Sequence, residues 1–282
     1  MYEKRITRKN PGLVVFLLDR SDSMKQKWGN LPYSLAEGAA NALNAILLDL
    51  LFTSQVEPGK PYHYFDIGVF GYGLRPASRD EGVEPALAGN LAGQPIIPLP
   101  SLRDNQVGMR DEPSEDAGAP PSRVPIWVQP AFGHKTPMCE AIAVAGGHVY
   151  NWAGEHPDSF PPIVINITDG MVTDSPFQGA SINDWAQRLV NISTNDGPAL
   201  LFNIFLSPTP ANTVVFPPTP AGLPVPGPDL FRISSPLPPP MLANAAGAGM
   251  TLLPGARGFA FNADRQTLAA FLNVGTTVGT GD

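Results

Sequence analysis

The amino-acid sequence predicts an α/β protein built on a doubly wound, mostly parallel sheet with one antiparallel edge strand and long loop insertions. The first observation is that residues 13–18 and 163–168 form almost uninterrupted apolar runs, which are typical of strands buried on both faces. The second is that segments with helical spacing alternate with such strands along the chain. This alternation is the pattern of a parallel sheet covered by helices on both sides.

The elements of the first half follow from local signals. Ser34 and Glu37 have the spacing of a capping box, which predicts a helix that continues to about Leu51. Residues 64–70 are expected to form the next strand after the one at 13–18. A hairpin near residues 64–74 would supply the antiparallel edge of the sheet.

The second half continues the alternation. A helix from Met138 to about Ala153 is rich in small residues, which favours close packing on the sheet. A helix around residues 182–192 and a strand at 200–206 follow the strand at 163–168. The last predicted elements are a short strand at 258–261 and a helix that begins at Asn262 or Asp264 and runs through Leu268, Phe271 and Leu272.

We interpret residues 1–282 as one domain with insertions at about 74–130 and 207–240. The first insertion is rich in Pro, Gly and acidic residues and poor in periodicity, and loops of such length are usually functional or disordered. In the proline-rich second insertion, residues 213–216 predict a short strand. Its apolar residues Leu230, Phe231 and Ile233 favour docking on the sheet, although a loop that only stiffens the chain is an open alternative.

Oxygen-bearing side chains follow the first predicted strand at alternate positions. Asp19, Ser21 and Ser23 come directly after residues 13–18, and ligand sites in parallel sheets lie at the carboxyl ends of the strands. A carboxylate and two hydroxyls are hard donors with too little charge to neutralise a divalent ion, so they suit Mg²⁺ held partly by water or a partner. Turn formation and helix capping would explain the same residue types.

Two further segments favour the metal site. The strand at 163–168 also ends on an acid, Asp169, followed by Gly170. Between the two strands, residues 133–138 form a loop in which Thr136 is followed by a proline at the start of a predicted helix. Asp-x-Ser-x-Ser, a Thr-Pro loop and Thr-Asp-Gly, in this order, resemble the metal-ion-dependent adhesion site (MIDAS) of von Willebrand factor A (VWA) domains.

The resemblance implies a Rossmann-like VWA fold and a Mg²⁺ or Mn²⁺ site. It implies that the Ser21, Ser23 and Thr136 hydroxyls ligate the metal, and that Asp19 and Asp169 hold its waters. In the family, a carboxylate from a protein partner completes the coordination. Arg20, His134 and Lys135 would then surround the site and favour an acidic partner, unless Arg20 and Lys135 are simply solvated side chains.

The resemblance also gives a cellular context. Residues 234–238, followed by an Ala-rich turn, resemble bacterial cytoplasmic VWA proteins, some of which accompany a Ser/Thr kinase and a phosphatase. A kinase or phosphatase is therefore a candidate partner, and bacterial signalling or stress defence a candidate process. The protein would be a metal-dependent protein-binding module and not an enzyme.

Composition is compatible with this interpretation. The net charge of −7 argues against nonspecific binding to nucleic acid. The polar start at residues 1–5 shows no secretory signal, and no apolar stretch is expected to span a membrane. The single cysteine, Cys139, excludes an internal disulfide. We therefore expect a cytoplasmic protein without membrane or nucleic-acid partners.

Two other functions are open. A metal-dependent hydrolase could use Asp19 as nucleophile or ligand, with His134 or Cys139 in a catalytic role. However, the position two residues after Asp19 holds Ser21 and not the second acid of haloacid-dehalogenase-type enzymes, and no P-loop is present. The second alternative is a structural subunit of a cytoplasmic assembly whose metal site is filled by a neighbouring copy.

For several residues near the site we expect structural roles and not ligand roles. Met24 should pack beneath the metal loop, and Gly170 should permit the tight turn after Asp169. Thr173 and Asp174 are expected to cap the helix at 182–192, and Asp22 the first helix. Trp127 and Phe132 could brace the Thr136 loop.

Overall fold

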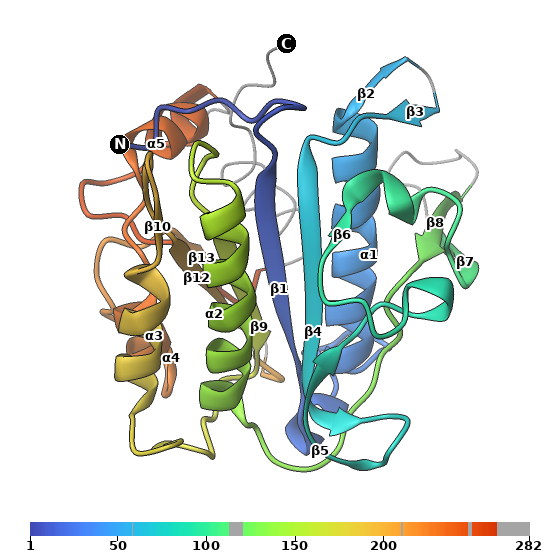
Figure 1. The fold of residues 1–282 in the computed structure, drawn as a ribbon. Helices are drawn as coiled ribbons and strands as arrows, with labels where there is room; N and C mark the ends of the chain where they lie inside the picture. The colour runs from blue at the N-terminus through green and yellow to red at the C-terminus, as the bar shows by residue number, and fades with distance from the viewer. Residues whose placement is uncertain (58, 113–120, 210, 248–249, 264–282) are drawn as a thin grey trace.

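A central sheet with helices on both faces forms the protein (Figure 1). The computed structural model describes residues 1–57, 59–112, 121–209, 211–247 and 250–263. Within these residues the main sheet has eight strands, seven of them in the order β13-β14-β12-β9-β1-β4-β5, with β6 also paired to β4. The predicted helix through Leu268 and Leu272 lies outside the described residues.

The two longest strands of the main sheet are β4 and β1. They are β1 (Gly12–Arg20), β4 (Phe65–Arg75), β5 (Asp80–Pro85), β6 (Ile97–Pro98), β9 (Ile163–Thr168), β12 (Leu200–Phe205), β13 (Val214–Val215) and β14 (Phe259–Phe261). The pairs β4–β1, β1–β9, β9–β12 and β12–β14 are parallel. The predicted doubly wound, mostly parallel sheet is therefore confirmed.

Antiparallel strands lie at the edges. β5 pairs antiparallel with β4 as the predicted edge hairpin, and β6 pairs with β4 in the same sense. At the opposite edge β13, predicted at residues 213–216, runs antiparallel to β14. The antiparallel edge was thus predicted correctly on the β4 side, and the sheet has a second one.

The strand order of the main sheet reverses direction between β1 and β9. Across the sheet from the β5 edge, each strand comes earlier in the chain than the one before it as far as β1. Beyond β1, the strands β9, β12 and β14 come successively later in the chain. Such a reversal is a topological switch point, where open α/β sheets bind ligands beyond the carboxyl ends of the strands. Four of the five predicted metal residues lie at or just after the carboxyl ends of β1 and β9, the two strands that flank this point, and Thr136 lies before α2.

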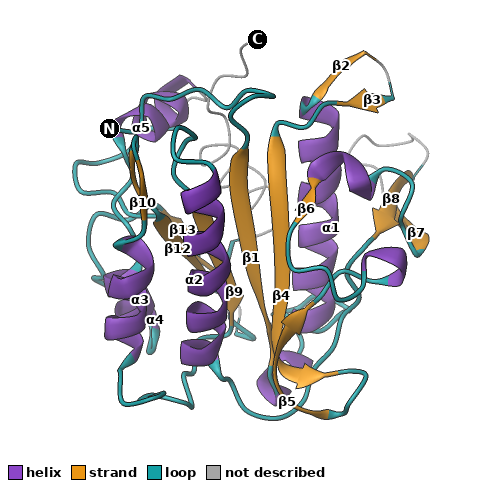
Figure 2. Ribbon diagram, viewed as in Figure 1, coloured by secondary structure: helices purple, strands orange, loops and turns teal. Residues whose placement is uncertain are grey.

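The helices divide between the two faces of the sheet (Figure 2). They are α1 (Leu35–Thr53), α2 (Met138–Glu155), α3 (Ile182–Val190), α4 (Gly227–Ile233) and α5 (Pro239–Gly247). Alternate residues of β1 enter two apolar clusters: Val14, Phe16 and Leu18 pack with α1, and Leu13, Val15 and Leu17 pack with α2. Side chains of a strand alternate between faces, so the apolar run of β1 builds both cores.

Helix α1 begins as the sequence predicts. The Ser34 hydroxyl accepts a hydrogen bond from the Glu37 amide, and the Glu37 carboxylate accepts one from the Ser34 amide. Contrary to the expectation that no apolar stretch is long enough to span a membrane, Leu35–Thr53 is long and apolar enough to do so, with a mean hydropathy of 1.4. Since 72% of that window is buried inside the protein, its apolar character is accounted for by the core.

The first insertion contains regular structure that its sequence pattern did not indicate. It holds β5 and β6, the short helices η2 (Gly89–Leu91) and η3 (Leu99–Leu102), and the antiparallel pair β7 (Gly108–Glu112) and β8 (Ser122–Ile126). Buried Asn44 of α1 anchors its end, because its Nδ2 donates to the Val128 carbonyl at 2.9 Å and its Oδ1 accepts from the Trp127 amide at 2.9 Å. A buried polar side chain thus fixes a long connection to the core.

The second insertion docks on the sheet as predicted. Leu230, Phe231 and Ile233 are buried on α4, which packs against β12 and β14. The remaining short elements are η1 (Asp22–Lys25), the pair β2 (Gln55–Glu57) and β3 (Lys60–Pro61), and the pair β10 (Ser193–Thr194) and β11 (Gly197–Pro198).

Candidate metal centre

Asp19 lies buried at the carboxyl end of β1, with 1% of its surface exposed. Its Oδ1 accepts a hydrogen bond from the Ser21 amide at 2.8 Å. Its Oδ2 accepts one from the Thr168 hydroxyl at 2.6 Å. The second bond ties the end of β1 to the end of β9 and fixes the carboxylate between the two strands. Thr168 was not among the predicted site residues.

The two serine hydroxyls of the motif meet. Ser21 Oγ lies 3.0 Å from Ser23 Oγ, while the intervening Asp22 points outward and pairs with Lys25. Asp22 opens the short helix η1, and Ser34 caps α1, so the expected capping of the first α-helix by Asp22 was wrong. Met24 is fully buried beneath this turn, as predicted.

The Thr136 loop is hydrogen-bonded to the β1 loop. The Gly133 amide donates to the Arg20 carbonyl at 2.9 Å, and the Asp22 amide donates to the His134 carbonyl at 3.0 Å. Thr136 itself is buried. These contacts bring the third predicted hydroxyl to the same end of the sheet as Ser21 and Ser23.

Thr173 and Asp174 hold this loop in place and do not cap α3, which corrects the expectation. Thr136 and Thr173 are joined twice, by the Thr136 amide to Thr173 Oγ1 at 2.8 Å and by the Thr173 amide to the Thr136 carbonyl at 3.2 Å. Asp174 accepts hydrogen bonds from the amides of Cys139 and Glu140 at the start of α2. Helix α3 is instead capped by Ser181, whose capping-box spacing with Asp184 was a readable signal.

Asp169 brings a second carboxylate to the site. Its Oδ1 is buried and has no hydrogen-bond partner among the described residues. Burial raises the pKa of Asp169, and a hydrogen bond from Ser23 only partly offsets this. Burial raises the pKa of Asp19 to about 7, and the nearby negative charge of Asp169 adds to the rise. The two carboxylates therefore repel each other when both are ionised.

Close backbone packing supports both loops. Gly73 of β4 has a φ of +114°, and a Cβ there would lie 2.6 Å from the Arg20 carbonyl carbon. Gly170, predicted to make the tight turn, has a φ of +109°, and a Cβ there would lie 2.6 Å from Pro226 Cγ. The second insertion therefore packs directly behind the Asp169 loop.

The donor set fits a small divalent cation. Carboxylate and hydroxyl oxygens from Asp19, Ser21, Ser23, Thr136 and Asp169 are the hard ligands that Mg²⁺ and Mn²⁺ prefer. The unpartnered Asp169 oxygen is a buried acceptor that a cation or its water would satisfy. No group of three or more His, Cys, Asp or Glu side chains suited to a metal occurs within the described residues, so the hydroxyls are essential to the set.

The residues predicted to surround the site differ in their burial. Arg20 is 4% exposed and pairs with Glu84, so it is not a solvated side chain, whereas Lys135 is exposed. Trp127 is buried and donates to the Leu102 carbonyl, while Phe132 is 45% exposed. Phe132 therefore does not brace the Thr136 loop by packing into the core.

No protein-family model and no curated protein matches the chain. Among solved structures, it is similar to the manganese-loaded Plasmodium vivax TRAP protein, with 14% identity, a TM-score of 0.43, and coverage of 93% of this chain and 72% of that chain. Because identity and TM-score are both low, the fold and site described above rest on this chain's own strand order and contacts.

Proposed function

We propose that the loops after β1 and β9, together with residues 133–136, bind Mg²⁺ or Mn²⁺ and use it to hold a carboxylate of a partner protein. The observation that carries this is that a buried carboxylate, Asp19, and a partly buried one, Asp169, lie close together, and that neither forms an ion pair within the described residues. Buried charge without compensation is costly, and a divalent cation would remove the repulsion between them.

The ligand set favours an added carboxylate. Ser21, Ser23 and Thr136 would contribute neutral hydroxyls, and the two aspartates would orient the metal's waters, so the cation would keep much of its positive charge. Mg²⁺ prefers six oxygen ligands and usually retains open positions for water or a bound acid. An acidic side chain of a partner would fill such a position.

Exposed apolar side chains near the site support a protein as the ligand. Phe132 is 45%, Met171 58% and Val225 84% exposed. They lie, respectively, before the Thr136 loop, after Asp169, and next to the Pro226 that packs on Gly170. Large exposed apolar side chains around a polar centre are typical of protein interaction sites.

We further propose that the site binds without catalysing a reaction. Burial raises the pKa of the Cys139 thiol to about 12, so it would be protonated and a poor nucleophile at neutral pH. His134 is exposed, and its Nε2 lies 3.1 Å from the Arg79 carbonyl. Neither residue therefore supports the hydrolase alternative.

Metal binding is tested with the full chain by Mn²⁺ electron paramagnetic resonance, in which bound Mn²⁺ loses signal intensity. We expect one site in the wild type and a loss of affinity of at least about tenfold in Asp169→Ala and Ser21→Ala. Asp22→Ala is the matched control, because this aspartate belongs to the same motif but is exposed and pairs with Lys25. Equal Mn²⁺ affinity in Asp169→Ala and Asp22→Ala would contradict the proposal.

The partner is tested by pull-down from the native host with Mg²⁺, with EDTA, and with Asp19→Ala. We expect a protein retained only by the wild type with Mg²⁺, and a Ser/Thr kinase or phosphatase from a cytoplasmic bacterial signalling system is our first candidate. A partner retained under all three conditions would exclude a role of the metal. Size-exclusion chromatography with and without Mg²⁺ separates this from the structural-subunit alternative, which requires a metal-driven increase in mass.

A further inference from the structure

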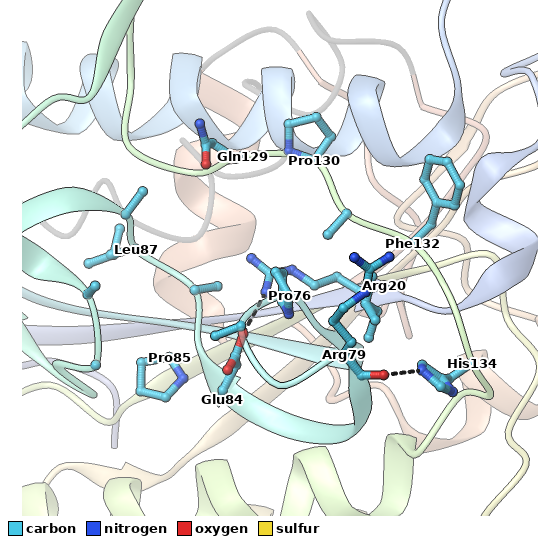
Figure 3. A pocket seen from close by; sticks show the side chains of 17 residues that line it. Arg20, Pro76, Arg79, Glu84, Pro85, Leu87, Gln129, Pro130, Phe132 and His134 are labelled. Carbon is cyan, nitrogen blue, oxygen red and sulfur yellow. Dashed lines mark hydrogen bonds and ion pairs between the residues drawn. The ribbon is translucent and has the colours of Figure 1, made fainter.

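A cleft of about 810 Å³ lies against the β4–β5 hairpin (Figure 3). Its walls come from the β4–β5 hairpin, from the chain after β5, and from residues 129–134. Arg20, the last residue of β1, and His134 line it, and in the chain Arg20 immediately precedes Ser21 while His134 lies two residues before Thr136. A ligand seated in the cleft would therefore contact residues that neighbour two of the proposed metal ligands, Ser21 and Thr136, in the chain.

Arg20 is a buried cation in this cleft with incomplete compensation. Its side chain is 5% exposed, and its Nη1 lies 3.4 Å from Glu84 Oε1. That separation exceeds the roughly 2.7–2.9 Å of a good charge-assisted hydrogen bond. Its Nε is buried without a hydrogen-bond partner among the described residues. A guanidinium normally presents its donors in pairs to a planar anion, so Arg20 has donor capacity to spare.

The sheet is built to accommodate the guanidinium. A Cβ at Gly71 of β4 would lie 2.5 Å from Arg20 Nε and 2.6 Å from its Cζ. Any side chain at position 71 would therefore displace the guanidinium. The absence of a side chain at Gly71 lets the Arg20 side chain lie directly against the backbone of β4.

The rest of the cleft combines positive charge with apolar surface. Arg79 adds a second cation at the rim, and Glu84 is the one acid of the lining, whereas Leu87 and Phe132 are apolar. The rim is closed by a contact between His134 Nε2 and the Arg79 carbonyl at 3.1 Å. Both rim residues have positive φ values, 63° for His134 and 61° for Arg79, and such conformations cluster at ligand sites.

We infer that this cleft binds a second carboxylate, carried on an apolar group, from the same partner protein that engages the metal centre. Arg20 pairs with that carboxylate, Arg79 adds attraction at the rim, and the apolar walls hold the attached group. The identity of the occupant as the metal-binding partner rests on the proposed function. The cleft's preference for an anion on an apolar body rests only on the residues described above.

The anion preference is tested in EDTA by NMR of the ¹⁵N-labelled full chain, following the Arg20 Nε–Hε signal. The probe is phenylacetate, which joins a carboxylate to an aromatic ring, and the matched control ligand is the uncharged 2-phenylethanol. We expect a saturable shift of the Arg20 signal with phenylacetate and none with 2-phenylethanol. Equal responses to the two compounds, or no response to either, would overturn the inference.

The decisive variant is Glu84→Gln, because replacing buried Arg20 would itself cost stability. Glu84 is partly exposed, with 28% of its side chain accessible, and it competes with the ligand for Arg20. Its neutralisation should tighten phenylacetate binding by a factor of about three to ten, the size expected for removing one partly exposed ion pair. If the Arg20–Glu84 pair is purely structural, Glu84→Gln should not increase the affinity for phenylacetate. Arg79→Ala, at an exposed position, should weaken binding.

Failure of the two proposals is distinguishable. The phenylacetate titration contains no metal, so it can succeed when Mn²⁺ binding fails, and the reverse also holds. With a captured partner, Glu84→Gln should strengthen the complex and Asp169→Ala should weaken it. If Glu84→Gln changes phenylacetate affinity but not partner affinity, the cleft binds acids but is not part of the partner interface.

Discussion

The Thr168 hydroxyl donates to Asp19 Oδ2 at 2.6 Å, and this bond joins the carboxyl ends of the two central strands of the sheet. Thr168 Oγ1 also accepts a hydrogen bond from the Gly170 amide at 2.9 Å. One buried hydroxyl thus orients the first aspartate of the candidate metal centre and shapes the turn that carries the second.

Replacing Thr168 by valine should lower both stability and metal affinity. The variant keeps the shape of the side chain but leaves Asp19 Oδ2 and the Gly170 amide without a partner, which costs about 1–3 kcal/mol for a buried group. Urea unfolding in EDTA measures the stability, and Mn²⁺ titration measures the affinity. Thr53→Val, at an exposed helix end, is the control and should change stability by no more than about 0.5 kcal/mol. An unaltered Mn²⁺ affinity in Thr168→Val would show that this bond does not organise the site.

Stability of the metal-free protein should fall as pH rises from about 4 to about 7. Burial and the charge of Asp169 raise the pKa of Asp19 to about 7 in the folded state, well above the roughly 3.9 of an unperturbed aspartate. In this window the folded protein retains a proton that the unfolded chain releases, so the free energy of unfolding decreases with pH. Below the window both states are protonated, and the stability is fully present.

Urea unfolding in EDTA at several pH values between 4 and 8 checks this dependence. Asp19→Asn removes the titrating group and should flatten the decline. With Mg²⁺ the trend should be opposed, because the cation competes with protons for the carboxylates and binds better as pH rises. If the wild type and Asp19→Asn show the same pH profile in EDTA, Asp19 is not the group responsible.

Much of the fold was predictable because its signals are local. The apolar runs of β1 and β9 and the Ser34–Glu37 capping box each lie within a few residues of chain, and they appear in the structure where the sequence places them. The β7–β8 pair was not predictable in this way. Its neighbouring segment at 127–128 is held by Asn44, more than eighty residues earlier in the chain, and periodicity carries no such information.

In the candidate site, too, the residues in short motifs were predictable, whereas residues that act through long-range contacts were not. Its five motif residues were predicted because three short segments, in order along the chain, together resemble the MIDAS of VWA domains. Thr168 was passed over as the last residue of a strand, since its contact with Asp19 joins residues 149 positions apart in the chain. Asp174 was assigned to the wrong helix, because proximity in sequence favoured α3 while the folded chain brings its carboxylate to α2.

Asp174→Ala should destabilise the start of α2. The carboxylate accepts hydrogen bonds from the Cys139 and Glu140 amides at 3.0 and 2.9 Å, in the manner of a helix cap supplied from another loop. Loss of such a cap costs about 0.5–2 kcal/mol. The exposed Asp22→Ala serves as the control. Hydrogen exchange of the Cys139 and Glu140 amides reports the effect directly, and unchanged protection there would argue against the capping role.

A chain of buried polar side chains crosses the sheet near the candidate metal centre. The Tyr72 hydroxyl donates to Asn166 Oδ1 at 2.7 Å, Asn166 Nδ2 donates to Asn203 Oδ1 at 3.0 Å, and Asn203 Nδ2 donates to Ser234 Oγ at 3.0 Å. It links β4, β9 and β12 to the end of α4 in the second insertion. Because every link lies in the core, loss of one donor leaves its acceptor unsatisfied.

Tyr72→Phe should therefore cost about 1–3 kcal/mol, the penalty for a buried acceptor without a donor. Tyr150→Phe, at a position 69% exposed, is the matched control and should have almost no effect. Combining Tyr72→Phe with Ser234→Ala in a double-mutant cycle tests whether the chain acts as a unit. An interaction energy above about 0.5 kcal/mol is expected, since the two residues share a hydrogen-bond network. Strict additivity would mean that the two ends stabilise the protein separately and that α4 is held by its apolar contacts alone.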